Sequence, residues 1–319
     1  MAQKKMILDL DTGIDDALAI AYALGSEEVD LIGITGTYGN VLVEQGVRNS
    51  LAMLDLFGRP DVPVFTGIPH ARTADSFKVL EVSSFIHGVN GIGEVEIPAS
   101  NRAPEARDAI DFIIESVHTY GKDLYYVPTG PLTNLAAAIE RDPSIQDEIG
   151  RVVFMGGALT VCGNVSAFAE ANISQDPEAA DLVFKSHIPM TMVGLDVTLQ
   201  TLLTRSETAR WHALGTPAGT ALADMTDYYI KALETTSPYL TGCSLHDPLA
   251  VAVAVDPTLV SVLPINLQCD VEGPSRGRTI GDNARLNDAR KSTDVCVTVE
   301  VDRFLHEFME RVTSLAQRA

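Results

Sequence analysis

The chain has 319 residues and a formal charge of −20; hydrophobic residues make up 46% of it and charged residues 21%. This composition provides enough apolar material for a core and excludes an intrinsically disordered chain. The negative charge argues against binding to nucleic-acid polymers or to anionic membranes, because both require a positively charged surface. The length allows either two domains or one large α/β domain.

The sequence carries no signal for export or membrane insertion. The first apolar run is interrupted by Asp9 and Asp11, so it is too short for a signal peptide. No stretch approaches the roughly 20 apolar residues of a membrane span. The cysteines are scattered and form no CxxC motif: Cys162, Cys243, Cys269 and Cys296. We therefore expect a cytoplasmic protein with reduced thiols and without a thiolate-bound zinc.

The first two thirds of the chain alternate between short apolar runs and amphipathic segments. In chain order, the pattern predicts strand 6–10, helix 15–25, strand 31–35, helix 41–57, strand 62–65 and a loop with a partial helix over 66–103. There follow helix 106–120, strand 124–127, helix 132–140, strand 152–155, a loop to residue 176, helix 177–185 and strand 190–195. Such alternation predicts a mostly parallel, Rossmann-like open sheet with helices on both faces.

The last third of the chain changes character. Several helices are expected between residues 206 and 256, where they would form a helical cap. Segments 262–271 and 295–301 resemble a small antiparallel addition, and 302–319 a closing amphipathic helix. Neither a repeat nor a linker interrupts the chain, so we expect a single α/β domain over residues 1–319.

A cluster of acidic residues follows the first predicted strand. Residues 9–16 read DLDTGIDD. Asp9 and Asp11 are two apart on a strand and should share a face, whereas Asp15 and Asp16 begin the next helix. Carboxylates packed this closely raise one another's pKa unless a cation balances them.

A divalent metal is the simplest source of that balancing charge. Neither lysine nor arginine occurs between residues 6 and 47. The oxygen ligands suit Ca²⁺ or Mg²⁺ rather than zinc. In the alternative interpretation, Asp15 and Asp16 only cap a helix while Asp9 and Asp11 face solvent.

Two enzyme families place such a loop at a strand end. Phosphohydrolases of the haloacid dehalogenase type carry Asp-x-Asp with Thr or Val two positions later, where this chain has Gly13. The loop instead resembles that of the nucleoside hydrolases of the inosine-uridine preferring type, Asp-x-Asp-x-Gly-x-Asp-Asp. Further segments resemble the same family in order: YGN at 38–40, IHG at 86–88, VPTGPLTN at 127–134, FMGG at 154–157, GN at 163–164, AEAN at 169–172, DPEAA at 176–180 and HDP at 246–248.

The resemblance implies a Ca²⁺-dependent N-ribohydrolase that splits ribonucleosides into ribose and free base. It implies Ca²⁺ ligation by Asp11, Asp16, Asp247 and the backbone carbonyl of Thr129, with Asp11 also acting as the general base toward the attacking water. Sugar hydroxyls would bind to Asp15, Asn40, Asn164, Glu170 and Asn172, with Met155 beneath the ring. An anionic pocket of this kind suits the oxocarbenium-like transition state of glycosidic cleavage.

The resemblance also implies residues that act on the leaving base. His246 resembles the family histidine that acts as an acid and protonates the departing base. The ordinary pKa of a histidine, about 6.5, would allow it to carry this proton near neutral pH. His87 is a second candidate near the base, and Tyr229 and Tyr239 could stack on it. The alternative for His246 is a purely structural role at a helix start.

Two departures from the family pattern affect the base preference. Ala171 and Leu233 stand where many family members carry aromatic residues. Loss of a stacking ring should weaken the binding of the larger purine bases more than that of pyrimidines, so we expect a broad or pyrimidine-leaning preference.

The resemblance further implies a homodimer or homotetramer. A Mg²⁺-dependent phosphohydrolase and a non-catalytic nucleoside-binding protein are the competing hypotheses.

Overall fold

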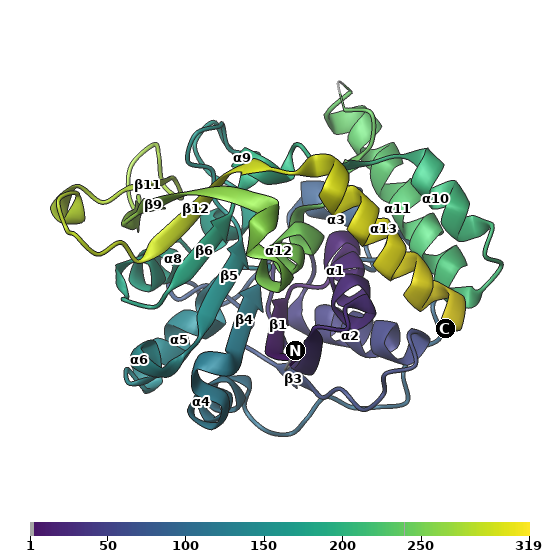
Figure 1. The fold of residues 1–319 in the computed structure, drawn as a ribbon, viewed down its shortest axis with the longest axis horizontal. Helices are drawn as coiled ribbons and strands as arrows, with labels where there is room; N and C mark the ends of the chain where they lie inside the picture. Colours follow the sequence, from purple (N-terminus) through teal and green to yellow (C-terminus); the bar gives the residue numbers. More distant parts are fainter. Residues whose placement is uncertain (1–2, 239) are drawn as a thin grey trace.

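The core of the computed structural model, which describes residues 3–238 and 240–319, is an eight-stranded sheet (Figure 1). Its strand order is β3-β2-β1-β4-β5-β6-β12-β9, and every pairing is parallel except that of β9 with β12. The strands are β1 (Lys4–Leu10), β2 (Val29–Gly36), β3 (Val64–Thr66), β4 (Leu124–Pro128), β5 (Arg151–Met155), β6 (Met190–Val193), β9 (Val260–Ile265) and β12 (Thr293–Val299). The predicted open, mostly parallel α/β sheet is thus confirmed.

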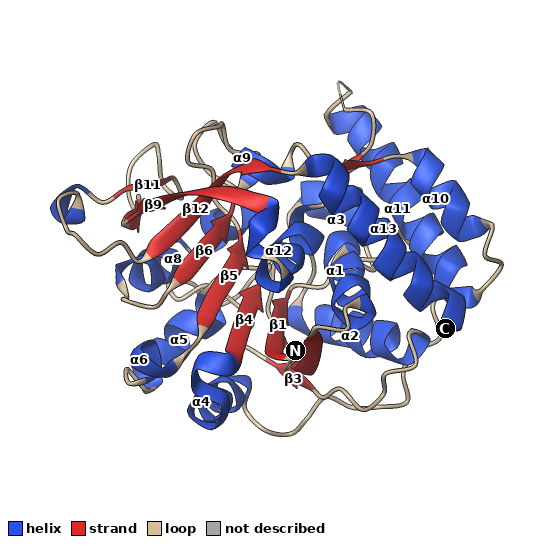
Figure 2. Cartoon of the chain, viewed as in Figure 1, coloured by secondary structure: helices blue, strands red, loops and turns tan. Residues whose placement is uncertain are grey.

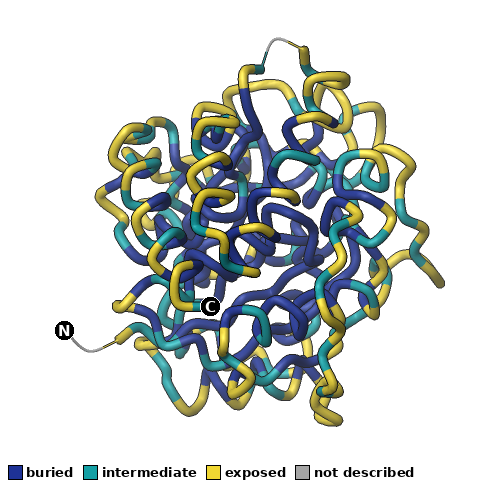
Figure 3. The backbone as a smooth tube through the Cα atoms, turned by 90° about the vertical axis from the view of Figure 1, so that its right-hand side faces the viewer, coloured by how far each residue is buried: buried dark blue, intermediate teal, exposed yellow. Residues whose placement is uncertain are grey.

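Helices cover both faces of this sheet (Figure 2). One face packs against α1 (Ile14–Gly25), α2 (Val43–Leu56), α12 (His246–Val255) and α13 (Val301–Arg318), and the other against α4 (Ala109–Tyr120), α5 (Thr133–Arg141) and α8 (Pro177–Lys185). In β1, Leu8 faces the first layer and Ile7 the second. Because both faces are covered there, the central strands β5 and β6 are buried along nearly their whole length rather than on alternate residues. Figure 3 shows the resulting buried backbone, in dark blue, running through the centre of the molecule.

Helix α12 is buried on all sides, which explains its uniformly apolar sequence after the first turn, LAVAVAV. It packs against α1 and against β4 and β5. Only its first two residues, His246 and Asp247, are polar. The packing therefore brings a carboxylate from late in the chain beside the start of α1.

The predicted helical cap lies at one end of the sheet. Helices α10 (Arg205–His212) and α11 (Pro217–Thr236) pack against each other and against α13 (Figure 1). The short strands β7 (Leu202–Leu203) and β8 (Cys243–Ser244) pair where the chain enters and leaves this region. Helix α3 (Glu81–His87) is the partial helix expected in the long loop, and it packs against α11. Among the helices of the described residues, none has the length and apolarity needed to cross a bilayer.

The antiparallel addition expected from 262–271 and 295–301 is present as the pairing of β9 with β12, but 262–271 does not form a single strand. The segment divides into β9, which joins the main sheet, and β10 (Leu267–Cys269), which forms an antiparallel hairpin with β11 (Thr279–Gly281). Asn266 separates them: its amide nitrogen donates to the carbonyls of Arg285 and Arg290, and its oxygen accepts from the Ser292 amide.

Several very short elements escape prediction because fewer than two helical turns leave no periodicity to detect. They are α6 (Ile145–Glu148), α7 (Ala171–Gln175), α9 (Leu195–Thr198) and the 3-10 turns Gly121–Asp123, Pro257–Leu259 and Asn283–Arg285. Two of them, α7 and α9, border the candidate site described below.

The aromatic cluster under α13 generates a stability prediction. Phe308 is fully buried and stacks on Tyr22 at a ring-centroid distance of 6.0 Å. Phe308→Ala should lower the free energy of unfolding by about 3–5 kcal/mol because it leaves a cavity. The matched change Leu286→Ala, at a side chain that is 63% exposed, should cost less than about 0.5 kcal/mol. Urea denaturation followed by circular dichroism measures both, and equal losses would contradict the packing described.

Candidate active site

The candidate site lies where the strand order of the sheet reverses, between β1 and β4. Ligands of open α/β sheets bind outside the carboxyl ends of the strands at such a point. A cavity of about 410 Å³ opens here, a volume suited to a small molecule. Its lining includes most of the residues expected from the sequence: Asp15, Asn40, His87, Thr129, Met155, Asn164, Glu170, Asn172, Tyr229, His246 and Asp247. The other two, Asp11 and Asp16, are fully buried near its floor.

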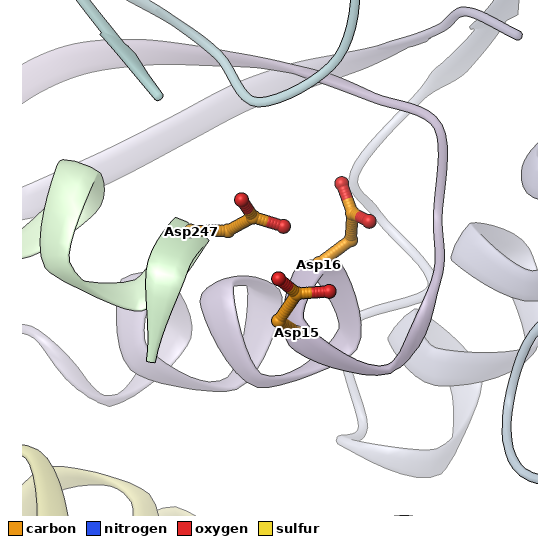
Figure 4. Close-up of side chains that lie close together, drawn as sticks. All are labelled: Asp15, Asp16 and Asp247. Atoms are coloured by element: carbon orange, nitrogen blue, oxygen red, sulfur yellow. The ribbon is translucent and has the colours of Figure 1, made fainter. Parts of the chain in front are cut away.

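Three carboxylates from two helix starts point toward one another (Figure 4), and two of them, Asp15 and Asp247, line the cavity. Asp15 and Asp16 belong to the first turn of α1 and Asp247 to the first turn of α12. One oxygen from each lies within 4.8 Å of the other two. The positive ends of both helix dipoles converge here, which favours negative charge.

Asp11 lies next to this group and is held by the loop after β2. Its Oδ2 accepts a hydrogen bond from the backbone amide of Asn40 at 2.6 Å. A Cβ atom on Gly39 would come within 2.0 Å of the same oxygen, so only glycine fits there. Asp11 Oδ1 and Asp15 Oδ1 are both buried without a hydrogen-bond partner in the described structure.

Asp16 is the most strongly hydrogen-bonded of these carboxylates. Thr129 Oγ1 donates to it at 2.7 Å, the Gly13 amide at 2.8 Å and Asn40 Nδ2 at 3.2 Å. These contacts tie together the ends of β1, β2 and β4. They hold the two carboxylate oxygens of Asp16 in one orientation.

Burial raises the pKa of each of these carboxyl groups. Burial, and then repulsion by Asp16, raises the pKa of Asp15 to about 8 and that of Asp11 well above its usual range. The pKa of Asp247 is raised in the same way, by burial and then by Asp15. Within the described residues, no lysine or arginine pairs with any of the four carboxylates. Unpartnered hard oxygens and uncompensated charge fit a divalent cation of the Ca²⁺ or Mg²⁺ type.

The wall on the α7 side is rigidly hydrogen-bonded. Glu170 caps α7 by accepting from the Asn172 and Ile173 amides, and it also accepts from the Gly157 amide at 2.9 Å. Burial raises the pKa of Glu170. Asn172 Nδ2 donates to the Thr129 carbonyl at 2.7 Å, which leaves that oxygen a second lone pair for another ligand. Asn164 Oδ1 accepts from the backbone amide of residue 171 at 3.0 Å.

Two neutral histidines and a tyrosine form the opposite wall. His87 Nδ1 accepts from the Ile14 amide at 3.2 Å, so its proton resides on Nε2. Its ring lies 5.4 Å from that of Tyr229. Burial lowers the pKa of His87 to about 3 and that of His246 to about 4. The expectation that His246 is protonated near neutral pH is therefore wrong for the ligand-free protein, because burial disfavours the charged ring.

Asp9 does not join the acidic cluster, contrary to the grouping of residues 9–16 by sequence. Its carboxylate accepts from Thr35 Oγ1 at 2.6 Å and Asn134 Nδ2 at 2.8 Å, within the layer beneath the strand ends. Asp9 lies inside β1, whereas Asp11 lies beyond its end, so the period of two does not extend to Asp11.

Sequence reasoning missed an apolar part of the lining. The cavity is also bordered by Leu80, Val82, Ile86, Leu195 and Leu199, which lie on or beside α3 and α9. Helix α9 is a single turn without a periodic signal, and the partial helix expected over 66–103 has no predicted bounds, so the sequence does not assign these side chains to the site. The predicted stacking residue Tyr239 lies outside the described residues.

Comparison with known proteins points to one family. The model of the inosine-uridine preferring nucleoside hydrolases matches residues 6–306. A probable uridine nucleosidase 2 of Arabidopsis thaliana is 35% identical, over 97% of this chain and 98% of its own length. The pyrimidine-specific ribonucleoside hydrolase RihA of Escherichia coli O7:K1 is 33% identical, over 96% and 97% respectively. The solved structure of a purine-preferring ribonucleoside hydrolase from Gardnerella vaginalis is 68% identical with a TM-score of 0.98, covering 99% of this chain and all of that one.

The acidic cluster generates a prediction on stability and pH. Asp15 has a folded-state pKa of about 8, against about 4 for an unfolded aspartate, so between those values the folded protein binds more protons and its stability falls as pH rises. The two buried histidines act oppositely, but only below about pH 6.5, where the unfolded chain takes up their protons. Above about pH 6.5, the stability of the calcium-free protein should therefore fall faster than that of the calcium-saturated protein.

Melting temperatures measured at several pH values between about 6.5 and 8.5, with calcium and with a chelator, test this expectation. The gap between the two curves should widen with pH. A gap that stays constant, or closes, would contradict a cation site made of these carboxylates.

Proposed function

Because the chain belongs to the inosine-uridine preferring nucleoside hydrolase family, we propose that it is a Ca²⁺-dependent hydrolase of the N-glycosidic bond of ribonucleosides. We further propose that it accepts nucleosides with several different bases and prefers purines. Nucleoside hydrolase activity on ribonucleosides follows from family membership. The choice of ion, of base and of residue roles is our proposal. The observation that carries it is the buried carboxylate cluster beside a nucleoside-sized cavity, a cluster that has no lysine or arginine partner among the described residues.

The proposed cation ligands are Asp11, Asp16, Asp247 and the Thr129 carbonyl. Their oxygens are the ligands that Ca²⁺ prefers, and the flexible coordination of Ca²⁺ suits an irregular set from two strand ends and two helix starts. When bound, the cation supplies positive charge that orients the ribose diol and makes the attacking water more acidic. Asp15, Asn40, Asn164, Glu170 and Asn172 are proposed to bind the sugar hydroxyls, with Met155 beneath the ring.

Asp11 is the proposed general base. Its Oδ2 is fixed by the Asn40 amide, so Oδ1 is free to accept a proton from water at the sugar. As the bond between C1′ and the base breaks, positive charge develops on the ribosyl ring. Buried carboxylates close to that ring stabilise this charge more strongly than water could, since the site has a low dielectric constant.

Assistance to the leaving base is assigned to His246, with His87 and Tyr229 beside the base. Burial keeps both imidazoles neutral. His246 is therefore proposed to donate a hydrogen bond to the departing base through its N–H group, and the proton that the base finally gains comes from water. The ring of Tyr229 offers a surface for stacking next to His87. This wall therefore recognises a flat, hydrogen-bond-accepting leaving group.

The base preference rests on two observations that point in opposite directions. Ala171 and Leu233 lack the rings found in many family members, which led us to expect a broad or pyrimidine-leaning enzyme. The proteins named for uridine or pyrimidines are about one-third identical, however, whereas the purine-preferring hydrolase is 68% identical. The greater similarity to the purine-preferring hydrolase favours purines. The apolar residues of α3 and α9 that line the cavity provide a surface for the larger base in place of the missing rings.

The remaining expectations are that residues 1–319 form one domain, that the chain assembles as a homodimer or homotetramer and that it resides in the cytoplasm. They stay predictions. Family membership gives no support to the Mg²⁺-dependent phosphohydrolase, and the complete set of proposed ligands disfavours a non-catalytic nucleoside-binding protein.

The first functional prediction concerns turnover. With calcium, the protein should release ribose and free base from inosine, detected by a reducing-sugar assay and by chromatography of the base. Asp11→Asn keeps the shape of the side chain but removes the base, and it should lower kcat by at least about 100-fold. The matched control Asp61→Asn, at an exposed residue paired with Arg59, should retain wild-type turnover. Full activity in Asp11→Asn would refute its role, and no ribose from any ribonucleoside would refute the function.

The second functional prediction concerns the base. In a panel of inosine, adenosine, guanosine, uridine and cytidine, kcat/KM should be highest for a purine ribonucleoside. The corresponding 2′-deoxynucleosides should be poor substrates, because the 2′-hydroxyl is proposed to bind at the cation. Faster cleavage of uridine or cytidine would instead support the pyrimidine-leaning interpretation.

A further inference from the structure

One polar contact behind the base-side wall has no part in the function described so far. The Nδ1 atom of His246 lies 2.8 Å from Oγ1 of Thr198. Thr198 is the last residue of α9 and is fully buried. The contact joins His246 to an element that is 48 residues away in the chain.

The backbone on both sides of this contact is held firmly. The Thr198 amide donates to the Gly194 carbonyl, which closes the single turn of α9. Three residues later the Thr201 carbonyl accepts from the Leu245 amide at 2.9 Å, directly before His246. Strands β7 and β8 then pair antiparallel. Thr198 and His246 are therefore placed opposite each other by the pairing of their two segments.

The hydrogen-bonding needs of the hydroxyl determine the direction of this contact. Among the described residues, His246 is the only hydrogen-bond partner of the Thr198 hydroxyl. A buried hydroxyl without an acceptor for its proton is costly, and the lone pair of a neutral imidazole nitrogen is a suitable acceptor. If Thr198 donates to Nδ1, the ring proton must reside on Nε2, the ring nitrogen on the other side from Thr198.

We propose that Thr198 is a positioning residue for the leaving-group step: its hydroxyl donates to Nδ1 of His246, so that Nε2 carries the ring N–H and donates a hydrogen bond to the departing base. This inference rests on the proposed function of His246. It predicts that Thr198 matters only for substrates whose leaving group needs a hydrogen-bond donor as it departs. Loss of fold or of sugar binding would affect all substrates alike.

Kinetics on two kinds of riboside test this. Inosine releases a base that needs a hydrogen-bond donor as it departs, whereas 4-nitrophenyl β-D-ribofuranoside releases a phenolate that leaves without one. Thr198→Val keeps the shape of the side chain and removes the hydroxyl. It should lower kcat for inosine by about 100-fold, with KM within about threefold, because a misplaced catalytic group costs that much. Its rate on the nitrophenyl riboside should stay within about threefold of wild type.

Two control variants isolate the hydroxyl. Thr198→Ser restores the donor and should recover inosine turnover to within about fivefold of wild type. Thr201→Val makes the same chemical change three residues away, where the hydroxyl donates to the Thr198 carbonyl, and it should leave both substrates unaffected. In a His246→Phe background, Thr198→Val should cause no further loss on inosine.

Several results would overturn the proposal. They are equal losses on both ribosides, no loss on inosine, or an additive loss in the His246→Phe background. If Thr198→Val does not fold, 15N NMR of wild-type protein labelled at histidine decides instead, with the signal assigned by its disappearance in His246→Phe. A proton on Nε2 supports the proposal and a proton on Nδ1 contradicts it. Failure of the wild-type protein on both ribosides would refute the proposed function itself, which is a distinguishable outcome.

Discussion

The burial of several like charges in one place is the constraint on which the rest of this structure depends. Asp11, Asp15, Asp16 and Asp247 are all buried, and burial and mutual repulsion raise their pKa values. Such an arrangement is costly unless it is compensated. Two helix N-termini and a few hydrogen bonds compensate part of it, while two carboxylate oxygens have no hydrogen-bond partner within residues 3–238 and 240–319. The protein thus keeps a site whose charge a bound cation, and then a cationic transition state, would balance.

The fold supports this site through elements that look purely structural. The uniformly apolar helix α12 is buried between α1 and the sheet, and that packing sets Asp247 against the first turn of α1. The loop after β2 must contain glycine at residue 39 for Asp11 to be held by a backbone amide. On the other wall, α9 places Leu195 and Leu199 along the cavity and Thr198 behind His246. Each contribution depends on contacts between segments that are distant in the chain.

The alternation of strands and helices could be predicted from the sequence because the elements of the parallel sheet are long and strongly apolar. Helix 177–185 was predicted with the bounds that the structure shows. Candidate site residues could be named because motifs after the strands resemble those of the family, and the structure brings most of them to one cavity. The spacing of the residues does not show that Asp9 and Asp11 point to different places. That difference arises because β1 ends at Leu10, so that Asp9 lies inside the strand and Asp11 beyond it. Local spacing also missed α7 and α9 as helices, because such short helices have no detectable period, and it missed the apolar side chains of α3 and α9 that line the cavity through tertiary contacts. The protonation of His246 depends on burial, which the sequence does not reveal.

Calcium binding followed by isothermal titration calorimetry tests the central claim most directly. If a cation replaces the protons that burial holds on these carboxylates, binding must release protons, since the ligands have to be ionised. We expect one calcium per chain at about pH 7, with an apparent enthalpy that depends on the ionisation enthalpy of the buffer and no binding in Asp16→Asn. Absence of binding by the wild-type protein, or binding that releases no protons, would contradict it.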